Sequence, residues 1–221
     1  WLQTALAQTT EPHAVRGRAL VKLGELHHLL EESILAEQHL QEGLALWQTL
    51  ADRLSIAYTY LQLGKVYATR AEHEQAKALL SESLTLYRQL GHRWGIATLL
   101  NQLGSMEIHL GNYEQANQLL DEAWPLVQRM EQRPTIGVAA NLLGRALLGK
   151  GQVERAITLF QRALQIFQQE DAQAGIAWSL INLALTYLQI GEVTTAQRYF
   201  QDCFRVYRKL ESKGGMMATL E

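Results

Sequence analysis

The sequence contains little cysteine and little proline, and it has no excess of one charge. Its 221 residues include one cysteine, three prolines, 20 basic and 22 acidic side chains, for a formal net charge of −2. A lone cysteine, Cys203, excludes an internal disulfide framework and suits a reducing compartment, so we expect a cytoplasmic protein. No apolar run approaches the ~18 residues that indicate a membrane span, and basic side chains do not cluster as in nucleic-acid-binding proteins. We therefore expect neither membrane insertion nor direct nucleic-acid contact.

What the sequence does have is a repeat with a period of forty residues. A leucine followed by a small residue recurs at Gly24, Gly64, Gly104, Gly144 and Ala184. A second series in the same register consists of Ala36, Ala76, Ala116, Ala156 and Ala196. A fixed period in this range predicts a solenoid or a similar repeat architecture. Because such an architecture has no single catalytic cleft by default, the period favours a protein that is not an enzyme.

Each repeat has the pattern of two antiparallel helices. Ile56, Tyr60, Leu63 and Tyr67 are spaced as on one face of a helix, and the following segment shows the same kind of pattern, without strand-like alternation. We expect an all-α, right-handed α-solenoid with helices over 14–30 and 34–50, 54–70 and 73–90, 93–110 and 113–130, 134–149 and 153–169, and 173–190 and 193–210. We expect one repeat domain over 1–221, with partial helices at 1–10 and 213–221. Since the chain opens on Trp1, we also expect it to be part of a longer protein.

The turn inside each repeat carries its own signal. Gly111, Gly151 and Gly191 suit the left-handed residue that commonly ends a helix. The equivalent positions in the first two repeats hold Glu31 and Ala71. Either these residues adopt the left-handed conformation at a cost of roughly 1 kcal/mol, or the turn takes another shape.

Small residues predict close packing of the paired helices. A third small series consists of Gly43, Ser83, Ala123, Ala163 and Cys203, and the bulk between the series comes from Leu40, Leu80, Leu120, Phe160 and Phe200. Cys203 is therefore expected to serve as a small buried apolar residue. Pro134 falls near a helix start, where proline is tolerated. Pro125 falls inside a predicted helix, which it should kink.

Together these residues resemble the tetratricopeptide repeat. The resemblance rests on the leucine–glycine pair, an aromatic three residues on (Tyr67, Tyr187), the interhelical glycine and the alanine series. Its usual period is 34, and the longer period is similar to the sensor region of bacterial ATPase-linked transcription regulators and to adaptor repeats of kinesin light chains and polarity scaffolds. HEAT or armadillo stacking, whose period also reaches ~40, is the rival fold. His27, Glu107 and Leu147 depart from the aromatic position.

The resemblance implies that the first helices of the repeats line a concave groove that holds a partner. Helical geometry then predicts partner-binding residues at Tyr58, Lys65, Asn101, Asn141, Arg145 and Trp178, on a face that also includes His109, Leu148, Leu185 and Gln189. The asparagines would fix a peptide backbone, the two cations would pair with acidic groups, and the two aromatics would be apolar anchors. Alternatively, the asparagines bond neighbouring helices, the cations are solvated, and Trp178 packs within the stack.

The sequence contains no complete motif for catalysis or for metal binding. Residues 144–151 nearly match a phosphate-binding loop, but Gly151 replaces the serine or threonine that would hold magnesium, and the segment is helical. No HExxH motif or cysteine–histidine cluster is present. We expect no catalytic residue, metal or cofactor.

Three functions fit these observations. The first is a non-catalytic interaction module that binds a peptide or protein segment in the groove. The second is the sensor region of a larger regulator, which binds a small ligand. The third is a self-assembly scaffold, with weak association through the solenoid ends, where Leu2, Leu6, Met216 and Met217 are apolar.

Overall fold

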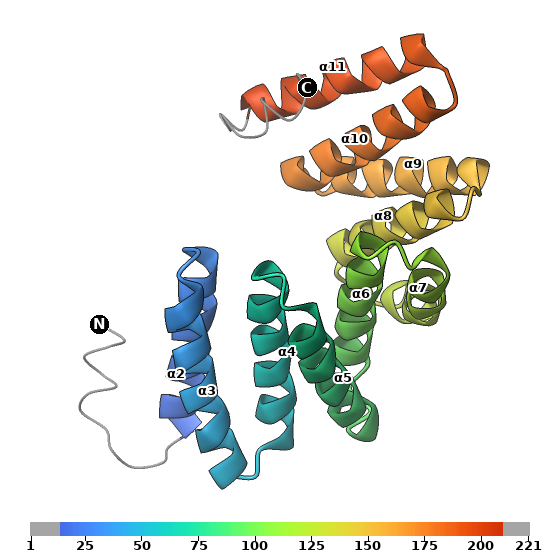
Figure 1. Cartoon of the computed structure of the whole chain (residues 1–221). Coiled ribbons are helices and arrows are strands. Elements are labelled where there is room, and N and C mark those ends of the chain that lie inside the picture. Colours follow the sequence, from blue (N-terminus) through green and yellow to red (C-terminus); the bar gives the residue numbers. More distant parts are fainter. Residues whose placement is uncertain (1–13, 210–221) are drawn as a thin grey trace. The chain divides into compact units, whose positions relative to one another are not determined.

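In the computed structural model, which describes residues 14–209, all regular secondary structure is α-helical (Figure 1). The helices are α2 (Ala14–Leu29), α3 (Ser33–Thr49), α4 (Arg53–Thr69), α5 (His73–Gln89), α6 (Arg93–His109), α7 (Tyr113–Val127), α8 (Arg133–Gly149), α9 (Val153–Gln169), α10 (Gln173–Gln189) and α11 (Val193–Lys209). No strand occurs between residues 14 and 209. Every helix begins and ends within one residue of its predicted bounds, except at the end of α7. The all-α prediction is confirmed.

The described residues form two compact units, which divide inside α6 between Leu99 and Leu100. In unit 1 (residues up to Leu99) the helices α2 to α5 each contact the next, and in unit 2 (residues from Leu100) the helices α7 to α11 do so. The first, or A, helices of neighbouring repeats also touch, α2 with α4 and α8 with α10. Stacked helix pairs of this kind are the building units of a solenoid. That the chain is one domain stays a prediction, and the partial helices predicted at 1–10 and 213–221 lie outside the described residues.

The turns between A and B helices use a left-handed residue in every repeat. Gly111, Gly151 and Gly191 have φ of 77°, 76° and 83°, as predicted. Glu31 and Ala71 adopt the same conformation, with φ of 62° and 59°, so the first of the two alternatives holds. After each of these residues the chain closes the helix end with paired backbone bonds, as in Glu32 N–H to the carbonyl of His27 at 2.9 Å.

The small residues allow the close packing that their register predicts. A Cβ added to Gly24 would lie 2.5 Å from Leu40, and one added to Gly144 would lie 2.5 Å from Phe160. All five alanines of the second series are buried, none more than 1% exposed. Cys203 is also fully buried, and burial raises the pKa of its thiol to about 11. The interpretation of Cys203 as a packing residue is confirmed.

A further set of glycines in the A helices lies against bulky aromatic side chains of the B helices. A Cβ on Gly17 would lie 2.6 Å from the ring of Trp47, and one on Gly137 would lie 2.7 Å from Phe167. Because both rings rest on helix backbone, the B helices of these repeats approach their A helices closely along most of their length.

Pro125 lies near the C-terminal end of α7, which is shorter than predicted. It lies inside the last turn of the helix and has no N–H to donate to the preceding turn. The helix ends two residues later, at Val127, where the N–H of Gln128 bonds the carbonyls of Leu126 and Trp124. The sequence predicts a helix that runs to 130 with a kink at Pro125. The helix ends at Val127, and the kink stays a prediction.

The helices of the described chain are all too short or too polar to cross a membrane.

Candidate functional site

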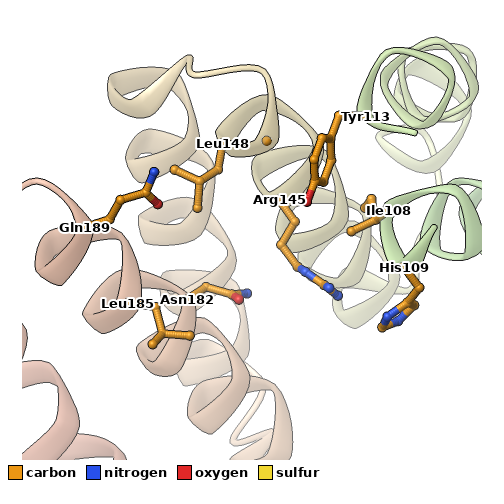
Figure 2. Close-up of a pocket in the computed structure, with 9 residues that line it drawn as sticks. Ile108, His109, Tyr113, Arg145, Leu148, Asn182, Leu185 and Gln189 are labelled. Atoms are coloured by element: carbon orange, nitrogen blue, oxygen red, sulfur yellow. The ribbon is translucent and has the colours of Figure 1, made fainter. Parts of the chain in front are cut away.

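The A helices of unit 2 form a pocket of about 580 Å³. Its lining residues are Ile108 and His109 of α6, Tyr113 of α7, Arg145, Leu148 and Gly149 of α8, and Asn182, Leu185 and Gln189 of α10 (Figure 2). His109, Arg145, Leu148, Leu185 and Gln189 all belong to the face predicted from helical geometry. The structure therefore brings these residues of the predicted face together in one depression.

Arg145 is the only basic side chain besides His109 among the residues that line this pocket. The residue is half-buried, and its guanidinium points into the pocket in Figure 2. Within residues 14–209 it has neither a hydrogen bond nor an ion pair. Burial lowers the pKa of Arg145, while the nearby Tyr113 phenol has the opposite, smaller effect. Because an arginine stays protonated even so, the pocket holds a positive charge that lacks a counter-charge from the described chain.

Asn182 adds a second unpaired donor. Its Nδ2 is buried and has no hydrogen-bond partner within the described residues. Figure 2 shows the Asn182 amide extending from α10 toward the middle of the pocket. A buried polar atom without a partner costs about 1–3 kcal/mol. The pocket thus contains two donor groups that a ligand could satisfy.

Tyr113 shapes the wall of the pocket through contact with a glycine. Its ring lies so close to the backbone of Gly149 that a Cβ at that position would overlap the ring. Gly149 therefore fixes where Tyr113 lies, because any larger residue would displace the ring. Leu148, Ile108 and Leu185 supply apolar surface beside it.

The two predicted asparagines lie deeper than a groove surface. Asn101 is 7% exposed and Asn141 is fully buried. The Nδ2 of Asn141 donates to Ser179 Oγ at 2.9 Å, and Ser179 Oγ donates to the carbonyl of Gly175 at 2.9 Å. This bond joins α8 to α10, as in the alternative in which the asparagines bond neighbouring helices. Contact of Asn141 with a partner stays a prediction. The Oδ1 atoms of Asn101 and Asn141 are buried without a partner.

Tyr58 and Lys65 lie in unit 1, on α4, beside two charged residues of α2. Lys22 Nζ lies 2.6 Å from Glu25 Oε2, 3.5 Å from the Tyr58 hydroxyl and 5.5 Å from the centre of the Tyr58 ring. Lys65 Nζ donates to Gln62 Oε1 at 3.4 Å. Burial lowers the pKa of Lys65, and the carboxylate of Glu25 offsets part of that shift. The cluster holds two lysines and one glutamate, so Glu25 balances one of the two positive charges.

Trp178 is partly buried and packs against the unit 2 core cluster that includes Leu142, Leu143 and Leu183. It does not line the pocket. Its packing corresponds to the alternative in which it belongs to the stack, and a role as an anchor for a partner stays a prediction.

Tyr113 and Asn182 are not among the predicted residues. Tyr113 begins a B helix at a position where the other repeats have Ser33, His73, Val153 and Val193. Asn182 follows Ile181, at a position held by Lys22, Gln62, Gln102 and Leu142. Tyr113 could have been identified from the sequence, because it is the aromatic residue at its repeat position. Asn182 could not, because polar residues are common at its repeat position.

Two further predictions concern chemistry. Residues 144–149 of the segment that nearly matches a phosphate-binding loop lie in α8, so the segment is helical as predicted. Within residues 14–209 no three histidine, cysteine, aspartate or glutamate side chains gather as a metal site would require.

Comparison with known families identifies the repeat. Residues 15–89, 95–169 and 135–209 match the family model of the tetratricopeptide repeat. A comparison with curated proteins finds no match.

Solved structures share the fold at low identity. The tetratricopeptide repeat sensor protein of the STAND class of signal-transduction ATPases from Pyrococcus horikoshii has 15% identity and a TM-score of 0.81 over 99% of this chain and 33% of that chain. The Rap conjugation gene regulator of plasmid pLS20 in complex with the Phr* peptide has 13% identity and a TM-score of 0.76 over 93% and 57%. A putative kinesin light chain from Podosopora anserina has 17% identity and a TM-score of 0.70 over 93% and 100%. This chain thus spans about a third of the first protein and just over half of the second.

Proposed function

Because the chain belongs to the tetratricopeptide repeat family, whose members generally mediate protein–protein interactions and are generally non-catalytic, we propose that it binds an extended protein segment over the A helices of unit 2. The segment would lie across α6, α8 and α10, over the pocket lined by Arg145 and Asn182. Binding through this face needs no cofactor and no chemical step.

The observation that carries the proposal is the set of unpaired polar groups at one pocket. Arg145 has no partner within the described residues, and the Nδ2 of Asn182 is buried without one. Burial of the Asn182 Nδ2 without a partner destabilises the isolated fold, since its hydrogen bond to water is lost and not replaced, whereas the half-buried Arg145 keeps contact with solvent. A bound segment would supply the missing partners, and the apolar side chains of Leu148 and Leu185 would add contact area.

The structural neighbours are consistent with this proposal. The pLS20 Rap regulator, which shares the fold, was solved with the Phr* peptide bound. Its identity to this chain is 13%, so the likeness supports the fold and the general mode of binding and does not name a partner.

The experiment is a peptide-display selection against the full chain, followed by two matched variants. Leu185 on α10 and Val193 on α11 are each 50% exposed, so replacing either with lysine leaves the core intact. We expect Leu185→Lys to weaken binding of the selected peptides about tenfold or more, because it places a charge at the proposed interface. Val193→Lys should bind as the parent does.

Two results would contradict the proposal. One is a selection that yields no binding peptide. The other is an equal loss of affinity in Leu185→Lys and Val193→Lys, since that would place the interface away from the A helices of unit 2.

A small-ligand sensor is the second candidate function. The pocket volume of about 580 Å³ lies within the ~300–1,000 Å³ typical of small-ligand sites, and a tetratricopeptide sensor region is among the structural neighbours. A thermal-shift screen with a metabolite collection tests it, and a hit whose stabilisation disappears in Leu185→Lys would favour it over peptide binding. Weak self-association through the chain ends also stays a prediction, to be tested by scattering at several concentrations.

A further inference from the structure

We infer that the pocket of unit 2 receives the side-chain carboxylate of an acidic residue, glutamate above all, in the bound segment. This inference rests on the proposed function and adds to it the chemical class of the residue that is recognised. Arg145 and Asn182 are the two groups that would contact the carboxylate.

The charge balance of the pocket is the first argument. Arg145 carries a positive charge in a partly buried position, and no aspartate or glutamate is among the pocket-lining residues. The acidic residue next to Tyr113 in sequence, Glu114, pairs instead with Lys150, with Oε2 2.8 Å from Nζ. A carboxylate in the pocket would balance Arg145 and could accept two parallel hydrogen bonds from its planar guanidinium.

The hydrogen-bonding pattern is the second argument. The guanidinium of Arg145 offers only N–H donors, and the buried unpaired atom of Asn182 is the donor Nδ2, so the partner that both lack is an acceptor. A lysine or arginine of the segment would be repelled by Arg145 and would offer no acceptor. An apolar side chain would cover both groups and leave them without partners, which makes binding weaker. A carboxylate accepts directly from Arg145. It pairs with the Asn182 Nδ2, which is closed to solvent in the unbound chain, when that amide turns toward it.

The single positive charge of Arg145 and the apolar residues beside it restrict the chemical class of the ligand further. One guanidinium balances the single charge of a carboxylate, whereas a phosphate group carries nearly two charges and would leave one uncompensated. Leu148, Ile108 and Leu185 lie around the donors and suit the methylene groups of a glutamate side chain. A segment that crosses several helices presents side chains to the pocket and not its terminus, so the carboxylate belongs to a side chain.

The test uses labelled heptapeptide libraries with acetylated and amidated ends. Their central residue is fixed as glutamate, aspartate, glutamine or lysine, and the other six positions are degenerate. The full chain should retain the glutamate library about tenfold more than the glutamine library and should retain the lysine library least, as expected for a charge-assisted hydrogen bond. Arg145→Gln should abolish this preference.

Matched variants separate this inference from a general effect of charge. Arg162 lies on α9, where its guanidinium stacks over the Trp124 ring at 4.9 Å from the ring centre. Arg162→Gln removes the same charge outside the pocket and should keep the glutamate preference. Asn182→Asp supplies an internal carboxylate of nearly the same shape and should lower retention of the glutamate library. Circular dichroism melts of each variant verify that it is folded.

Each remaining outcome contradicts a defined part of the inference. Equal retention of the glutamate and glutamine libraries would overturn the inference and leave the proposed function standing, whereas no retention of any library would overturn both. A glutamate preference that persists in Arg145→Gln would overturn the assignment of Arg145. Stronger retention of peptides with a free terminal carboxylate than of the end-blocked glutamate library would overturn the side-chain source of the carboxylate.

Discussion

The A helices of the two units use the same repeat positions for different residues. In unit 1, one position of this face holds Val21 and Leu61, which are 4% and 0% exposed, while unit 2 has Asn101 and Asn141 there, 7% and 0% exposed. At the position of Arg145, unit 1 has Glu25 and Lys65. Glu25 pairs with Lys22 at 2.6 Å and Lys65 donates to Gln62 Oε1 at 3.4 Å, whereas Arg145 has no such partner within residues 14–209.

The residues at the first of these positions contribute to fold stability in unit 1, and in unit 2 we propose that they contribute to binding. Unit 1 fills the position of Asn101 and Asn141 with the apolar Val21 and Leu61, whose burial favours the fold. In the described part of the chain, buried side-chain atoms without a hydrogen-bond partner occur in both units. They are Glu25 Oε1, His27 Nε2, His28 Nδ1 and His73 Nδ1 in unit 1, and the Oδ1 atoms of Asn101, Asn117 and Asn141 and the Nδ2 of Asn182 in unit 2. In unit 2 one of these atoms, Asn182 Nδ2, belongs to a residue that lines the pocket beside Arg145, and we therefore propose unit 2 as the binding unit.

The largest effect is expected when a unit 2 residue is placed in unit 1. Leu61→Asn buries an amide in an apolar site and should lower the free energy of unfolding by about 2–4 kcal/mol. Urea denaturation measures the change. Leu26→Asn, at a leucine of α2 that is 46% exposed, is the control and should change stability by less than about 0.5 kcal/mol. Equal effects of the two variants would show that position 61 is not a demanding apolar site.

The reverse exchange replaces a unit 2 asparagine with an apolar residue and tests the same comparison. Asn141→Ala should lower the free energy of unfolding by about 1–3 kcal/mol, because the bond to Ser179 is lost and space is left. Asn141→Leu restores the volume, removes the unpaired Oδ1 and leaves Ser179 bonded to Gly175, so it should cost less than about 1 kcal/mol. If leucine destabilised as much as alanine, the asparagine would be a structural requirement of unit 2.

Asn101 tests the binding side of the same position. Asn101→Ala should weaken binding of a selected peptide by about 1 kcal/mol, measured by calorimetry, because its unpaired Oδ1 would lose an N–H donor from the segment. Asn117 on α7 is the matched control, since it is 8% exposed and its Oδ1 is also unpaired. Loss of affinity in Asn117→Ala and not in Asn101→Ala would place the partner on the B helices.

The smallest effect concerns pH and unit 1. Burial lowers the pKa of His28, and the positive charge of Lys65 lowers it further. The folded state therefore binds fewer protons than the unfolded state between the lowered pKa and the ordinary value of 6.5, so stability rises with pH through that range. The contribution of neutral His28 to the stability of the folded state is fully present above pH 6.5. It is lost as the pH falls through the lowered pKa of His28. Unfolding free energies between pH 5 and 7.5 should show a shallower slope for His28→Gln, and an unchanged slope would refute this assignment.

The sequence predicts the scaffold well because forty-residue spacing controls it. Gly144 and Phe160 occupy positions whose contact follows directly from the repeat register, and the structure shows that contact. Gly111 and Ala71 share one turn position, so the conformation of the glycine extends to the alanine. Such features depend on neighbours at fixed separations, which a sequence displays.

The pocket is less predictable because it depends on contacts between repeats. The period identifies the face on which Asn141 lies, but not that α10 covers it with Ser179. Likewise the position of Tyr113 follows from its contact with Gly149, thirty-six residues away in sequence and in another repeat. Helical periodicity assigns a face to each residue and does not give the depth at which a neighbouring helix buries it.

The most direct test of the central claim is a double-mutant cycle between Arg145→Gln and a glutamate-to-glutamine change at the central position of a selected peptide. Calorimetry gives the four binding free energies. We predict a coupling energy of at least about 1 kcal/mol, because either change alone removes the charge-assisted hydrogen bond and the second then costs little. Additive effects, with a coupling energy below about 0.3 kcal/mol, would show that Arg145 and the acidic side chain do not interact, and would contradict the account.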